Sequence, residues 1–157
     1  MKSVYIETPI VSYLAARPSR DLIVAAHQQI TYDWWQSRNQ YELIVSELVI
    51  TEASRGNTTA SALRMTILEG MKRLALSEQA RFVARQLVAA NLVPAKAIAD
   101  ALHIAAAATG GIDFLLTWNC AHIANATTRP KIENWLRIQG ITPPTICTPE
   151  ELIGNQP

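Results

Sequence analysis

Residues 4–14 read VYIETPIVSYL, and this stretch sets a pattern that the rest of the chain repeats. Its first part is short and rich in β-branched and aromatic residues, which predicts a strand from Ser3 to Glu7. Thr8 and Pro9 then favour a helix start, because threonine caps a helix and proline fits its first turn. The chain therefore opens with a strand that passes into a helix, with a carboxylate at the junction.

Short strands and longer helices alternate along the remaining sequence. Further strands are predicted at 41–45, 74–76, 112–117 and 145–147. Helices are predicted at 8–16, 21–37, 46–55, 58–70, 77–91, 94–110 and 129–139. Short apolar strands that alternate with helices indicate a parallel sheet covered on both faces. Since no repeat or flexible linker interrupts the pattern, we expect one α/β domain over residues 1–157.

The composition excludes several classes of protein. The chain is 49% hydrophobic and 17% charged with a net charge of +1, which is typical of a globular domain. A nearly neutral chain is not expected to coat nucleic acid by charge alone, so a catalytic role stays open. We find no secretory signal and no apolar run of the roughly 20 residues that cross a bilayer. We therefore expect a cytoplasmic protein without a membrane segment, with Cys120 and Cys147 as free thiols.

Four polar side chains are expected at one edge of the predicted sheet. Glu7 ends the first strand, and Asn119 follows the strand at 112–117. Glu52 and Asp100 lie about one and a half turns into helices that begin at this same edge. Three carboxylates at one edge repel each other unless a cation neutralises them, and oxygen ligands favour Mg²⁺ or Mn²⁺ over zinc. Such an ion can activate water for attack on a phosphodiester.

Neighbouring residues are candidates for supporting this site. The hydroxyls of Thr8 and Thr117 could hold a carboxylate or a metal-bound water, although Thr8 could equally be only a helix cap. His122 follows Asn119 by three residues and is a candidate for the same supporting shell. Four residues near this edge could contact RNA, and the alternative for each is a position on the solvated surface. They are Arg17, Arg55, Lys96 and, as a stacking surface, Trp118.

Other polar residues fit structural roles. Asp113 begins its predicted strand, more than about 13 Å from the edge that carries Glu7. His103 lies one helical turn beyond Asp100 and is expected in the core or on a dimer surface rather than as a ligand. Cys120 and the histidines lack zinc-finger spacing.

Four strings resemble, in order, the motifs of the PIN-domain family. They are VYIETPIVSYL at 4–14, SELVITEASRG at 46–56, AIADALHIAAA at 97–107 and FLLTWNCAHIAN at 114–125. The family's active-site positions match Glu7, Glu52, Asp100 and Asn119, and its metal positions match Glu7, Asp100 and Asn119. The resemblance implies a Rossmann-like three-layer α/β/α sandwich with a central parallel sheet. It also implies cleavage of RNA by hydrolysis that depends on Mg²⁺ or Mn²⁺.

Within that family, the pattern is most similar to VapC-type ribonuclease toxins of type II toxin–antitoxin pairs. That resemblance implies a homodimer held in check by a small antitoxin. The chain departs from the family at Glu7, where aspartate is commoner, and at Asn119 and His122, where acids are often found. A catalytically weakened PIN-like module that binds RNA or a partner therefore stays open as an alternative. A nucleotide-binding protein lacks support, since neither G-x-G-x-x-G nor G-x-x-x-x-G-K-[ST] occurs.

Overall fold

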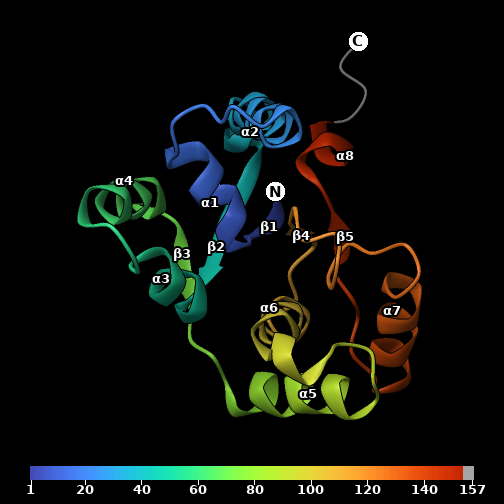
Figure 1. The fold of residues 1–157 in the computed structure, drawn as a ribbon. Helices are drawn as coiled ribbons and strands as arrows, with labels where there is room; N and C mark the ends of the chain where they lie inside the picture. The colour runs from blue at the N-terminus through green and yellow to red at the C-terminus, as the bar shows by residue number, and fades with distance from the viewer. Residues whose placement is uncertain (154–157) are drawn as a thin grey trace.

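Five parallel strands form the centre of the computed structural model, which describes residues 1–153 (Figure 1). Their order across the sheet is β3-β2-β1-β4-β5, and every neighbouring pair is parallel. The strands are β1 (Lys2–Ile6), β2 (Tyr41–Ser46), β3 (Lys72–Leu74), β4 (Phe114–Leu116) and β5 (Thr145–Cys147). The predicted parallel α/β sheet is thus confirmed.

Helices cover both faces of this sheet. The α-helices are α1 (Thr8–Ala15), α2 (Leu22–Trp35), α3 (Glu47–Ala53), α4 (Thr58–Leu68), α5 (Glu78–Ala89), α6 (Ile98–Thr109), α7 (Arg129–Ile138) and α8 (Pro149–Ile153). Helices α1, α2, α4 and α8 lie on one side, and α5, α6 and α7 lie on the other (Figure 1). This is the predicted three-layer sandwich.

The order in which successive strands are added to the sheet reverses at β1. The strands β2 and β3 lie on one side of β1, whereas β4 and β5 lie on its other side. In open α/β sheets a crevice forms beyond the carboxyl ends of the strands at such a switch point. Ile6 pairs in register with Leu116. The residues that follow these two strands, Glu7 and Thr117, therefore lie side by side at the carboxyl edge of the sheet. We call this edge of the sheet the crevice.

The core beneath this crevice consists of buried apolar side chains. The central strands bury Val4, Tyr5, Ile6 and Leu115 completely. On the other side, α6 buries an alanine run at 105–108, and small side chains let the helix approach its neighbours closely. Protein interiors are generally close-packed, so a buried core of this kind should hold the residues at the strand ends in place.

Strands β3 and β4 and the start of α6 are among the elements that differ in extent from the sequence predictions, and the short helix α8 was not predicted. Strand β3 lies two residues earlier than predicted because it pairs with β2 through Ile44 and Lys72, and the charged edge position of Lys72 suits a strand exposed to water. Strand β4 is shorter than the predicted 112–117, because it covers only the residues that pair with β1 and β5. The backbone at Pro94 is extended and leads into a 3₁₀ turn at Ala95–Ala97. As a result α6 starts later than predicted, and Asp100 falls in its first turn.

No helix within residues 1–153 is both long enough and apolar enough to cross a membrane. Both cysteines are free thiols, with Cys120 exposed and Cys147 buried on β5.

Candidate active site

Glu7 is a buried carboxylate at the switch point between β1 and β4. It precedes α1 and is only 4% exposed. The Thr117 hydroxyl donates a hydrogen bond to its Oε2 at 2.9 Å. Burial raises the pKa of Glu7 to about 7, and the negative charges of Glu52 and Asp100 add to this rise, although His103 and Thr117 oppose it. The surroundings of Glu7 therefore disfavour the ionised form of its carboxylate.

Glu52 reaches the same crevice from α3. The helix starts directly after β2, where the Ser46 side chain accepts a hydrogen bond from the Val49 N–H. The Oε1 atom of Glu52 accepts hydrogen bonds from the Thr8 hydroxyl at 2.6 Å and from His103 Nε2 at 2.7 Å. Burial alone would raise the pKa of Glu52. The bond and charge of His103, together with Thr8 and Arg55, outweigh burial and lower it.

Asp100 approaches from the opposite layer. It is half-buried in the first turn of α6, where the helix dipole favours an acid. Because its charge contributes to the raised pKa of Glu7, the two carboxylates lie within electrostatic range of each other. Glu7, which follows β1, thus interacts electrostatically with both Glu52 on α3 and Asp100 on α6.

Asn119 organises the loop that follows β4. Its backbone N–H donates to the Thr117 hydroxyl at 2.9 Å, and its Oδ1 accepts from the His122 N–H at 3.0 Å. The first bond ties Asn119 to the threonine that holds Glu7. The second uses one of the two lone pairs of the amide oxygen, so one remains for another donor or a metal.

The sequence analysis missed a buried polar network behind Glu52. His103 is a core residue, 1% exposed, and it contacts Glu52 on one side and Tyr5 on the other. Tyr5 in turn contacts Ser46. In the sequence pattern Tyr5 is only an aromatic residue of the first predicted strand, and Ser46 is only the first residue of the helix predicted at 46–55. The spacing of Asp100 and His103, one turn apart on a face that enters the crevice, was the one available signal.

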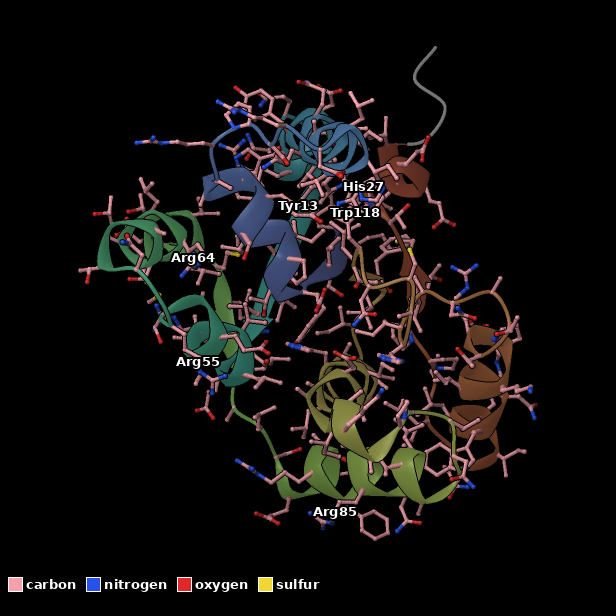
Figure 2. The ribbon with its side chains drawn as sticks, viewed as in Figure 1. Tyr13, His27, Arg55, Arg64, Arg85 and Trp118 are labelled. Carbon is pink, nitrogen blue, oxygen red and sulfur yellow. The ribbon has the colours of Figure 1, made fainter. Side chains whose placement is uncertain are left out.

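Basic residues are distributed unequally around the crevice. Arg55 is exposed just after α3, and Lys96 is exposed in the turn before α6. Arg64, labelled above Arg55 in Figure 2, binds the backbone oxygens of Ala53 and Arg55 and so holds the end of α3. Arg17 follows the far end of α1, about 12 Å along that helix from Glu7. Arg55 and Lys96 are therefore better placed at the crevice than Arg17.

Trp118 turns toward α2 and packs there. Its indole stacks on His27 with ring centres 4.0 Å apart and planes 9° from parallel. The indole N–H donates to the Thr31 hydroxyl at 2.7 Å. Figure 2 shows Trp118, His27 and Tyr13 gathered between α1 and α2. One face and the polar edge of this indole are thus already occupied.

The acidic side chains suit a hard divalent cation in their chemistry. All of the candidate donors are carboxylate or amide oxygens, which Mg²⁺ and Mn²⁺ prefer. Within residues 1–153 no three His, Cys, Asp or Glu side chains are grouped closely enough to coordinate one ion as they stand. Glu7 nevertheless has a buried carboxylate whose charge is unfavourable without a cation. A bound ion would remove that penalty and draw the mutually repelling carboxylates together.

The fold has neighbours among solved structures. A chain of VapBC2 from Rickettsia felis, solved bound to a DNA fragment from its promoter, matches 92% of this chain and 97% of its own length. The TM-score is 0.57 and the identity 13%. VapC20 of Mycobacterium tuberculosis, a Sarcin-Ricin loop cleaving toxin, matches 79% of this chain and 95% of its own, with a TM-score of 0.59 and 16% identity.

These likenesses confirm the predicted fold, which is a VapC-like PIN fold. No family model and no curated protein sequence matches the chain.

Proposed function

We propose that this protein is a metal-dependent ribonuclease that hydrolyses RNA phosphodiester bonds and acts as the toxin of a type II toxin–antitoxin pair. One observation carries the proposal. The buried Glu7 carboxylate stands at the switch point with the charges of Glu52 and Asp100 within electrostatic range. Acids that interact in this way repel each other, and a bound cation would offset that repulsion.

The chain's own residues would divide the work. Glu7, Asp100 and Asn119 would hold Mg²⁺ or Mn²⁺, which supplies an activated water and stabilises charge on the phosphate. The lowered pKa of Glu52 keeps its carboxylate ionised, so it can accept a proton. Thr117 and Thr8 hold Glu7 and Glu52 through the hydrogen bonds described above. Arg55 and Lys96, both exposed at the crevice, would contact RNA phosphates.

The proposal includes partners. RNA is the substrate, a small antitoxin would occupy the acidic crevice, and two copies of the chain would form a dimer in the cytoplasm. The resemblance of the four sequence strings and the fold shared with VapC20 and VapBC2 support these partners.

The direct test is cleavage of an RNA that contains unpaired loops. We expect cleavage with Mn²⁺ or Mg²⁺ and none with EDTA. Asp100→Asn should abolish cleavage while the protein keeps its unfolding temperature, because the change is nearly isosteric. Asp33→Asn, on the exposed face of α2, is the matched control and should cleave normally. Equal cleavage by the D100N protein, or cleavage that EDTA does not affect, would refute the proposal.

A PIN-like binding module that has lost catalysis is the second candidate. It is favoured by Asn119, whose amide oxygen already closes a turn with His122, and by the lack of a ready three-ligand group within the described residues. Calorimetry with Mn²⁺ separates the candidates. RNA binding without any metal binding would favour the binding module.

A further inference from the structure

Four hydrogen bonds form a continuous chain from the sheet to the crevice. Ser46 Oγ lies 2.7 Å from the Tyr5 hydroxyl, which lies 2.7 Å from His103 Nδ1. On the other side of the ring, His103 Nε2 lies 2.7 Å from Glu52 Oε1, which also accepts from Thr8. Ser46, Tyr5 and His103 are all buried. The chain therefore begins in the core and ends on one oxygen of one carboxylate.

The hydrogen bond between His103 and Glu52 has a defined donor and acceptor. An ionised carboxylate only accepts hydrogen bonds, so His103 Nε2 carries a proton whether the ring is neutral or charged. With a neutral ring, Nδ1 accepts from the Tyr5 hydroxyl, and Ser46 donates to Tyr5. Ser46 Oγ meanwhile accepts from the Val49 N–H at 3.5 Å. Every member of the chain is thereby satisfied.

The surroundings prevent the imidazole ring from turning. Tyr5 meets it edge to face, with ring centres 5.8 Å apart and planes at 69°. Rotation of the ring would break the bonds at both nitrogens inside a buried site, where unpaired polar groups are costly. Tyr5 is on β1, Ser46 is on β2 and His103 is on α6, so three packed elements hold the arrangement.

We propose that His103 is a positioning residue for Glu52, and that Tyr5 and Ser46 hold His103 in the one orientation that points its Nε2–H at Glu52. Oε1 is then occupied by His103 and Thr8. Within residues 1–153 no hydrogen bond reaches Oε2, which is left as the oxygen available to the reaction. The proposal rests on the proposed function only for the part that Glu52 plays. Replacing buried polar groups of this kind with well-packed apolar residues is often neutral or stabilising, so a gain in stability does not by itself explain them.

The first test removes the Tyr5 hydroxyl by Tyr5→Phe. In the metal-free wild-type protein, the Nε2 proton of His103 should give a downfield, slowly exchanging NMR signal. In the Y5F protein this signal should exchange faster, because the ring has lost its second hydrogen bond. RNA cleavage should fall about tenfold in kcat with KM little changed. Tyr41→Phe, which removes the hydroxyl of a half-buried tyrosine on β2, is the control and should change neither property.

The second test compares His103→Gln with His103→Leu. Glutamine can still donate from its Nε2 to Glu52, whereas leucine fills a similar volume without a donor. The H103Q protein should therefore cleave RNA faster than the H103L protein. If H103L does not fold, the Y5F comparison decides the question.

Unchanged exchange of the His103 signal in the Y5F protein would overturn the positioning role, as would equal cleavage by folded H103Q and H103L proteins. The NMR result needs neither metal nor RNA. A wild-type protein that shows the expected NMR behaviour but cleaves no RNA would therefore refute the proposed function and leave the positioning geometry standing.

Discussion

Glu7 and Asp113 are two acids at opposite ends of neighbouring strands. Asp113 lies just before β4, where its carboxylate accepts hydrogen bonds from the Ser3 N–H at 2.9 Å and the Ser3 hydroxyl at 3.1 Å. Lys2 Nζ is 3.7 Å away. The backbone bond from Ser3 is the main cause of a lowered pKa at Asp113. Glu7, beyond the other end of the sheet, is buried and has a raised pKa.

The two acids differ in how well the folded protein stabilises their negative charge. Asp113 has hydrogen-bond donors, a nearby lysine and partial access to water, so its negative charge is stabilised without further help. Glu7 has the Thr117 hydroxyl, but two other acids add to its unfavourable surroundings. The charge at Asp113 ties two strands together, whereas the surroundings of Glu7 disfavour the ionised form of its carboxylate.

The largest expected effect comes from neutralising each acid in turn. Glu7→Gln should reduce metal-dependent RNA cleavage by at least about a hundredfold, because it removes a charged oxygen ligand. The E7Q protein should be no less stable than wild type in EDTA, since it no longer buries a charge. Asp113→Asn should leave cleavage unchanged and lower the unfolding temperature. The comparison would fail if D113N lost cleavage as severely as E7Q.

The stability of the metal-free protein should depend on pH through Glu7. Its pKa is raised from an ordinary 4.5 to about 7 in the folded state. Between these values the unfolded chain releases the proton while the folded chain resists, so the free energy of unfolding falls as pH rises from about 4.5 to about 7. The loss attributable to Glu7 is about 3 kcal/mol, and it is complete above pH 7.

Urea unfolding in EDTA across this pH range measures that loss. The E7Q protein is the reference, because the difference between the two curves isolates Glu7 from other titrating groups. Added Mn²⁺ should flatten the wild-type curve by stabilising the ionised carboxylate. Parallel curves for wild type and E7Q would show that Glu7 does not have the raised pKa.

A smaller effect is expected from the cations at the two ends of the sheet. Arg55 is exposed beside Glu52, and Lys2 is exposed beside Asp113. Arg55→Ala should weaken RNA binding severalfold and lower the salt dependence of log K by about one unit. Lys2→Ala should change neither. RNA binding should be measured in EDTA, which prevents cleavage, at several salt concentrations. Equal losses of RNA affinity in both variants would mean that RNA does not bind preferentially at the Arg55 end of the sheet.

The smallest effect concerns the two thiols near the crevice end of the sheet. Cys120 is exposed in the loop after β4, while Cys147 is buried on β5, where burial raises its pKa to about 12. A thiol reagent should modify one cysteine in the folded protein and both after denaturation, because the thiolate is the reactive form. Bound RNA should slow the reaction of Cys120. Rapid modification of both thiols would mean that this end opens more readily than the structure indicates.

Local patterns predicted most of the elements because they depend on nearby residues. Asp21, Ser46 and Ser77 cap α2, α3 and α5 through their own side chains, and a cap needs only the residues that follow it. The elements that differed, such as β3 and the turn after Pro94, depend on partners far along the chain. Register with β2 located β3, and no local signal carries that information.

By itself, the sequence determined that the chain alternates strands with helices and that four polar residues follow strand ends or enter helix starts. Tertiary structure alone decided the strand order and the switch point at β1. It also decided that Glu7 is buried beside Thr117 and that Tyr5, His103 and Ser46 meet behind Glu52. The physical reason is that burial and hydrogen bonding between residues about 40 to 110 positions apart arise only when the sheet assembles.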